Sequence, residues 1–174
     1  MPTHNFAAPR GTLTEFTITS EALAGNLLGD PAERRVAVYL PEGYEESGED
    51  YPLFVDLVGL TGSGLAHLNW KPFDESVPQR LDRLVSTAEM GPVITVFPDC
   101  FTSLGGNQYI DSATMGRWES FLIDEMIPAV EERFRTATVR DSRRPNATVS
   151  SSTVSLGVTP SSAKSHDGTS IPSA

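Results

Sequence analysis

Residues 53–64 read LFVDLVGLTGSG. The first six of them are almost continuously apolar, which is typical of a strand that is covered on both faces in a parallel sheet. The other six hold three glycines and form a loop with few bulky side chains. Such a loop, at the carboxyl end of a buried parallel strand, can direct free N–H groups at a developing negative charge. We therefore expect a candidate site at Gly59 to Gly64.

Two other interpretations of this loop are considered. It could be a plain flexible connection between a strand and a helix. A phosphate-binding P-loop is poorly supported, because no Gly-Lys-Ser/Thr sequence follows the glycines.

The flanking sequence predicts further strands and a helix. Residues 12–19 and 34–40 alternate polar and apolar side chains, so we expect two half-buried strands there. After the loop, Ser76 is a suitable N-cap for a helix that reaches Met90-Gly91. Residues 92–97 are then the next buried strand.

The strongest helical pattern covers residues 117–135. Its apolar residues form one stripe: Trp118, Phe121, Leu122, Met126, Ile127, Val130 and Phe134. Pro128 lacks an amide hydrogen, so we expect a kink there or a new helix start just before it. The order of elements, three strands, a helix, a strand and a helix, predicts an α/β domain whose later strands are parallel.

Composition and charge exclude several classes of function. The chain has 13 Lys and Arg against 23 Asp and Glu, a formal net charge of −10, which disfavours binding to nucleic acid or to anionic membranes. The single cysteine, Cys100, excludes an intrachain disulfide and a cysteine-rich zinc site. Asp111, Asp124 and Glu125 fit solvated faces better than a metal site, so we expect no metal. No long apolar run and no leader-like start are present, which favours a soluble, cytoplasmic chain.

The composition changes near residue 136. Residues 137–174 contain no aromatic side chain but ten Ser and five Thr. Such a segment cannot bury enough apolar area to offset the entropy lost on ordering, so we expect a disordered tail after a domain over residues 1–136. A sharper hypothesis is that the tail arises from a premature stop or a frameshift.

Four segments together resemble a known family. They are RRVAVYLPEGY (34–44), YPLFVDLVGLTGSG (51–64), VITVFPDC (93–100) and GRWESFLIDEMIPAVEERF (116–134). Their order and spacing resemble the esterase branch of the α/β-hydrolases that contains enterochelin esterases and S-formylglutathione hydrolases. The resemblance implies a partial α/β-hydrolase-like sheet, with an antiparallel start followed by parallel strands joined by crossover helices.

The resemblance also implies a reaction and part of a site. Gly59, Leu60 and Thr61 match the family loop whose amides help to build an oxyanion hole, although relatives commonly have His-Gly where this chain has Val58-Gly59. The implied reaction is hydrolysis of a small-molecule carboxylic ester through an acyl-serine, without a cofactor. The nucleophile of this fold lies in a G-x-S-x-G turn, followed by an acid and a histidine.

That nucleophile motif does not occur in the 174 residues. Ser155 is the nearest weak candidate, behind a short predicted strand at 147–154, but Thr153 stands where the motif needs glycine. His166-Asp167 follows Ser155 by only 11 residues, whereas the family separates nucleophile and histidine by several elements. We therefore expect a truncated and inactive esterase.

The remaining polar candidates have simpler expected roles. His4 precedes the predicted fold, and His67 is either an ordinary exposed side chain or a substrate contact. Asp99 is expected to cap the turn after Pro98.

Two other functions stay open. One is a non-catalytic α/β module that binds a small ligand or a partner at the 59–64 loop. The other is a different hydrolase that uses Cys100 or Ser155. We also expect an unpaired edge on the strand at 53–58, which invites self-association.

Overall fold

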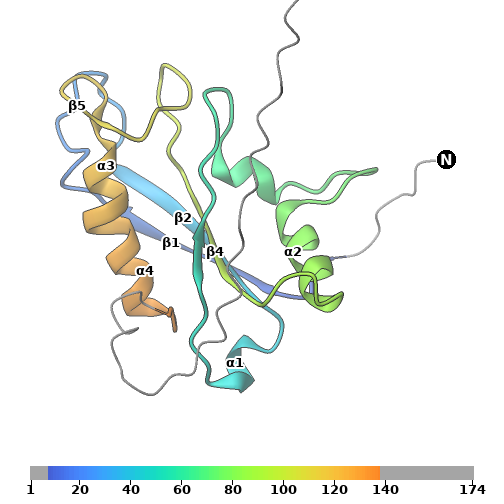
Figure 1. Cartoon of the computed structure of the whole chain (residues 1–174). Coiled ribbons are helices and arrows are strands. Elements are labelled where there is room, and N and C mark those ends of the chain that lie inside the picture. Colours follow the sequence, from blue (N-terminus) through green and yellow to red (C-terminus); the bar gives the residue numbers. More distant parts are fainter. Residues whose placement is uncertain (1–7, 138–174) are drawn as a thin grey trace, which may run out of the picture. The chain divides into compact units, whose positions relative to one another are not determined.

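A computed structural model describes residues 8–137 of the chain. Four strands form one sheet in the order β1-β2-β4-β3 (Figure 1). Their bounds are Thr12–Thr19 for β1, Glu33–Leu40 for β2, Leu53–Val55 for β3 and Ile94–Pro98 for β4. β2 pairs antiparallel with both β1 and β4, whereas β3 runs parallel to β4. The expected antiparallel start followed by parallel pairing is confirmed.

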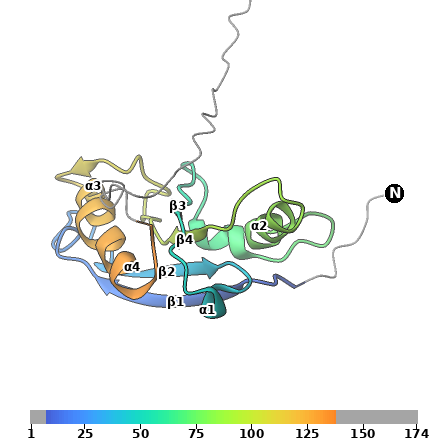
Figure 2. The same cartoon turned by 60° about the horizontal axis from the view of Figure 1, so that its bottom comes forward.

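The two central strands carry a core on each face of the sheet. Val36 and Val38 of β2 pack with the long helical segment that begins at Trp118. Ala37 and Tyr39 point to the other face, where they pack with Leu81. This alternation follows the period of two in a strand, and it places helices on opposite sides of the sheet (Figure 2).

β3 differs from the expectation. The sequence pattern predicts a strand over 53–58 that is covered on both faces, but only Leu53–Val55 pair in the sheet, and β3 is an edge strand. Phe54 is 58% exposed and Leu57 is 47% exposed. The prediction of coverage on both faces is wrong, because the face that carries Phe54 is left open. In addition, no strand among residues 8–137 pairs with the outer edge of β3.

Residues that follow the last helix lie beside the chain just before β3, on the side away from β4. Tyr51 forms a parallel bridge with Thr136. In this bridge the Tyr51 N–H donates to the Arg135 carbonyl at 2.9 Å, and the Ala137 N–H donates to the Tyr51 carbonyl at 2.7 Å. The segment that follows the last helix therefore arrives beside β3 in the parallel direction.

Helix α2 spans Val77–Ser86, with Ser76 as its N-cap. The Ser76 hydroxyl accepts from the Gln79 amide while the Gln79 side chain accepts from the Ser76 amide, so both donors are satisfied by a capping box. The helix ends earlier than the expected Met90, because Ala88 adopts the left-handed conformation with φ of 57°. Glu89 then donates back to the Leu84 carbonyl, as in a Schellman terminus.

The segment after residue 117 is one helical run of three parts. They are α3 (Trp118–Ser120), a π-helical turn labelled η2 (Phe121–Met126) and α4 (Ile127–Arg133). Pro128 lies in the first turn of α4, where the run changes from π to α hydrogen bonding; Met126 and Ile127 keep helical dihedrals, so the helix continues through this point without a separate start. The wider π turn ends where the proline removes a donor.

Several short elements were not expected from the sequence. They are α1 (Tyr44–Ser47), the 3₁₀ helix η1 (Gly64–Leu68), and the small hairpin of β5 (Asp111–Ser112) and β6 (Gly116–Arg117). None of the helices within residues 8–137 has the length and hydrophobicity needed to cross a bilayer.

Candidate functional site

The loop 59–61 lies at the carboxyl end of β3, beside the carboxyl end of β4 (Figure 1). The last ladder bond of this strand pair runs from the Asp56 N–H to the Val96 carbonyl at 2.9 Å. Beyond it the chain leaves the sheet and turns, with the Gly62 N–H donating to the Gly59 carbonyl at 3.0 Å. The loop thus occupies the edge at which open α/β sheets bind ligands.

The backbone amides of this loop have no acceptor in the part of the chain that the structure describes. Among residues 8–137, no carbonyl or side-chain oxygen accepts from the N–H of Gly59, Leu60 or Thr61. All three residues are exposed. Backbone N–H groups without an acceptor in the protein are among the donors from which oxyanion sites are built.

A second loop, residues 100–107, holds the first one in place. The Gly106 N–H donates to the Leu60 carbonyl at 2.6 Å, and Thr102 and Gly105 bond each other through both backbone groups. A Cβ atom on Gly106 would lie 2.8 Å from the Gly59 carbonyl oxygen and 2.9 Å from that of Leu60. The two loops therefore meet backbone to backbone, and glycine is required at position 106.

Replacing Gly106 tests this close approach. We expect Gly106→Ala to destabilise the fold by about 1–3 kcal/mol, because the new methyl group overlaps backbone atoms that must shift. Gly91→Ala is the matched control, since a Cβ at Gly91 meets nothing within 4 Å. The measurement is urea unfolding followed by circular dichroism. Equal unfolding midpoints for the two variants would contradict the contact.

A cavity of about 300 Å³ adjoins the loop. Leu60 of the loop and Gly106 of the second loop both line it, and Trp118 forms another part of its wall. Its complete lining is Leu60, Leu104, Gly106, Asn107, Gln108, Ile110, Ser112, Met115 and Trp118. This mixture, mostly apolar with a few amides and a hydroxyl, is typical of a site for a small organic molecule.

His67 has a partner that the sequence did not suggest. Its Nδ1 lies 2.5 Å from Oδ2 of Asp56, the residue that follows β3. The pair links η1 to the end of β3, behind the loop. The His67 side chain is 42% exposed, so the expected exposed side chain is observed with an added partner, and the substrate contact stays a prediction.

Cys100 lies at the carboxyl end of β4 and is only 4% exposed. Burial, together with the negative charge of Asp99, raises the pKa of its thiol to about 12. A buried, protonated thiol is a poor nucleophile. The geometry therefore disfavours the hydrolase that would use Cys100.

The reactivity of this thiol is directly measurable. At pH 8 a pKa of about 12 leaves about one thiol in 10,000 ionised, so we expect negligible reaction of the native chain with a disulfide reagent over minutes. The thiolate fraction rises with pH toward 12. Chain unfolded in urea is the control and should react fully, whereas rapid native reaction at pH 8 would contradict the assignment.

Asp99, Asp111 and Asp124 lie apart from one another and have different surroundings. Asp99 accepts from the Phe101 amide at 3.3 Å, which confirms its turn-capping role. Asp111 binds the amide and hydroxyl of Ser120, and these bonds lower the pKa of its carboxyl. Asp124 is exposed. No cluster that could hold a metal ion occurs in the described part of the chain.

Glu125 corrects one expectation. It does not lie on a solvated face, because its Oε1 accepts from the Ala22 amide at 2.8 Å and its Oε2 is buried. The Ala22 amide, in the 20–32 connection between β1 and β2, thus has its acceptor on the helical segment. Ser155, His166, Asp167 and His4 lie outside the described residues.

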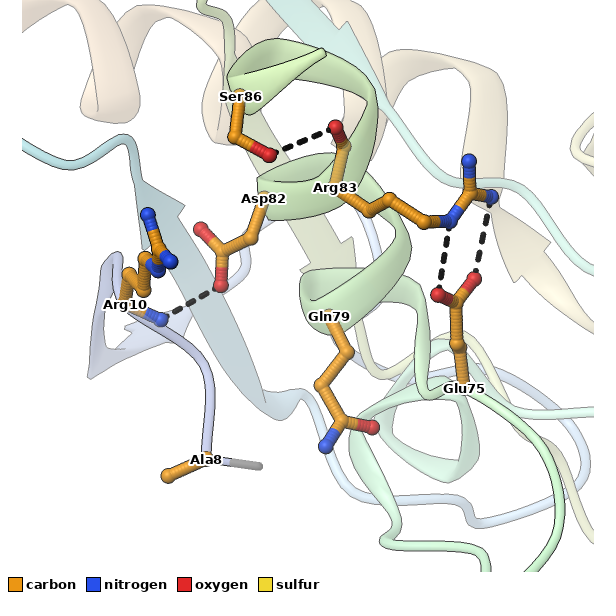
Figure 3. Close-up of a pocket in the computed structure, with 7 residues that line it drawn as sticks. All are labelled: Ala8, Arg10, Glu75, Gln79, Asp82, Arg83 and Ser86. Carbon is orange, nitrogen blue, oxygen red and sulfur yellow. Dashed lines mark hydrogen bonds and ion pairs between the residues drawn. The ribbon is translucent and has the colours of Figure 1, made fainter. Parts of the chain in front are cut away.

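A second cavity, of about 220 Å³, lies between α2 and the start of β1 (Figure 3). Glu75 and Arg83 pair at 2.8 Å on the α2 side of this cavity. Asp82 accepts from the amides of Arg10 and Gly11, at 2.6 and 3.1 Å, and from the Tyr39 hydroxyl at 2.6 Å. These groups bond one another, so the cavity serves as a structural junction, and it shares no residue with the 59–61 loop.

The family can now be assigned. The model of the family described as "Putative esterase" matches residues 31–150, which is more than half of the chain. The chain belongs to this esterase family. A comparison with curated proteins finds no match.

Solved structures support the same fold. A ferulic acid esterase from Anaeromyces mucronatus aligns with a TM-score of 0.55 and 20% identity, over 79% of this chain and 49% of that one. A feruloyl esterase module from Clostridium thermocellum, complexed with sinapinate, aligns with a TM-score of 0.52 and 22% identity, over 74% and 38%. A further ferulic acid esterase gives 0.53 and 24%, over 72% and 44%. This esterase-family chain therefore spans less than half the length of these structures.

Proposed function

We propose that this chain carries the carbonyl-binding part of a serine-type carboxylic ester hydrolase. The observation that carries the proposal is the set of three consecutive amides without an acceptor, at Gly59, Leu60 and Thr61. They lie beyond the carboxyl end of a parallel strand, and one of the three residues, Leu60, lines an apolar cavity. Membership of an esterase family supports assigning them to an ester carbonyl.

In this proposal the loop stabilises the charge that develops during acyl transfer. A serine oxygen attacks the ester carbonyl carbon, and the carbonyl electron pair moves onto its oxygen, where the loop amides donate to it. Collapse expels the alcohol, and water then hydrolyses the acyl-serine. A single donor of this kind contributes about 10²- to 10³-fold to the rate in other hydrolases.

The cavity beside Leu60 would accept the acyl group of the ester. Its walls carry Leu104, Ile110, Met115 and Trp118, which favour an apolar or aromatic group. Asn107, Gln108 and Ser112 supply polar groups that could orient a substituent. The proposed substrate class is therefore a small ester with an apolar or aromatic acyl part.

We further propose that the chain alone is inactive, because its sequence contains no G-x-S-x-G turn. The test is a longer chain, translated through one of the reading frames past codon 136. If one of the three reading frames past codon 136 encodes an apolar strand, this turn and a later acid and histidine, the extended chain should show serine-dependent esterase activity. If no frame encodes them, the frameshift hypothesis is wrong.

The cavity also supports a second candidate, a non-catalytic module for a small ligand. It predicts saturable binding of a small aromatic ester without turnover, in the extended chain as well as in the present one. Turnover that disappears on replacing the elbow serine by alanine would decide for the hydrolase.

A further inference from the structure

Tyr109 contacts the residue that immediately precedes the candidate loop. Its hydroxyl accepts from the Val58 N–H at 2.9 Å and donates to the Val58 carbonyl at 2.5 Å. One hydroxyl thus satisfies both backbone groups of a residue that has left the sheet ladder. The Val58 side chain is apolar and cannot supply these bonds itself.

Tyr109 is itself held in an unusual conformation. Its φ is 58°, in the left-handed region that residues other than glycine rarely adopt. Its N–H donates to Asn107 Oδ1 at 2.6 Å, and Asn107 Nδ2 donates to the Cys100 carbonyl at 2.6 Å. Asn107 is only 6% exposed. A buried amide at the end of β4 therefore imposes the backbone turn that presents the tyrosine to Val58.

The segment 106–109 forms hydrogen bonds to the loop at two points. Tyr109 binds Val58, and the Gly106 N–H donates to the Leu60 carbonyl at 2.6 Å, so this segment holds the 58–59 peptide and the 60–61 peptide. A tyrosine hydroxyl is protonated and able to donate at neutral pH, and burial raises the pKa of the Tyr109 hydroxyl further above that range. The amides of Gly59, Leu60 and Thr61 remain free for a ligand.

We infer that Tyr109 is a positioning residue: its hydroxyl sets the direction of the Gly59 amide through the shared Val58–Gly59 peptide, and acts with the Gly106 bond to hold the loop amides in place. The inference rests on the proposed function, because the amides it orients are those assigned to the ester carbonyl. Pre-organised donors are effective because they need no reorganisation during the reaction. Strained backbone at a functional loop is a recurrent way to achieve that.

The test is hydrogen–deuterium exchange of the 174-residue chain carrying Tyr109→Phe, read by mass spectrometry with single-amide resolution. The variant keeps the ring and removes only the hydroxyl. We expect the Val58 amide to exchange roughly five- to tenfold faster, the effect of losing one hydrogen bond. Exchange in β2 and β4 should stay unchanged.

Tyr51→Phe is the matched control. The Tyr51 hydroxyl donates to Ser47 Oγ at 2.7 Å, and its loss should leave exchange at Val58 as it is in the parent chain. Unchanged exchange at Val58 in Tyr109→Phe would overturn the inference. A uniform rise over the whole sheet would also overturn it, because it would indicate a general structural role.

A second measurement separates this inference from the proposed function. In the serine-dependent extended chain, Tyr109→Phe should lower kcat at least fivefold and leave KM within twofold, because misdirected amides affect the transition state more than substrate binding. A change in KM alone would contradict the positioning role. Faster exchange at Val58 together with an extended chain that never hydrolyses esters would leave the positioning intact and remove the proposed function.

Discussion

The 174-residue chain is expected to hydrolyse p-nitrophenyl acetate no faster than a denatured sample of itself. The reason is that an oxyanion loop without an activated nucleophile lacks the group that attacks the ester, and a serine without a general base is a weak nucleophile at neutral pH. Turnover should lie at least about a thousandfold below the median enzyme value of roughly 10 s⁻¹. Spectrophotometric detection of nitrophenolate measures it.

Covalent labelling provides the sharper control for this result. A serine-directed fluorophosphonate should leave the mass of the chain unchanged, and Ser155→Ala and Cys100→Ala should behave like the parent. Stoichiometric labelling that is lost in Ser155→Ala would show a complete nucleophile in this chain. That outcome would overturn the proposed inactivity and favour the hydrolase that uses Ser155.

Self-association through the outer edge of β3 is also expected. Phe54 is 58% exposed and Leu57 is 47% exposed, and no strand within residues 8–137 pairs with the outer edge of β3. We propose that this edge makes the chain self-associate, since an apolar edge strand is a template for pairing with another chain. The double variant Phe54→Lys, Leu57→Lys should shift the chain from oligomers to monomer, because charge on an edge opposes such pairing.

Light scattering coupled to size-exclusion chromatography measures this shift over a range of concentrations. Ile123→Lys is the control, because Ile123 is 56% exposed but lies on η2 and away from the sheet edge. A monodisperse parent monomer would contradict the proposal. Equal dissociation by Ile123→Lys would show that added charge alone, and not the β3 edge, controls association.

Much of the fold is predictable from local sequence. The alternation in 12–19 and 34–40 gives β1 and β2 almost to the residue, Ser76 marks the start of α2, and Pro128 marks the change from the π turn to α4. The exposure of β3 is not predictable in this way. A run of apolar residues indicates that a strand suits burial, but it carries no information on whether a neighbouring strand is present.

The candidate site is predictable only in part. The glycines at 59–64 indicate a ligand-binding loop because their spacing is local. The supporting residues Asn107 and Tyr109 lie about fifty positions away and carry no recognisable motif, so only the fold brings them to Val58. Glu125 was assigned to a solvated face because its acceptor role depends on Ala22, a partner 103 residues earlier.

The junction at Asp82 has a consequence for the order in which the chain folds. This carboxylate fastens Arg10 and Gly11, 72 and 71 residues earlier, and Tyr39, 43 residues earlier. Contacts over such separations are entropically slow to close, whereas β1 and β2 can pair as neighbours in the sequence. During synthesis the β1–β2 hairpin can therefore form first, and its leading end stays unfastened until α2 has left the ribosome.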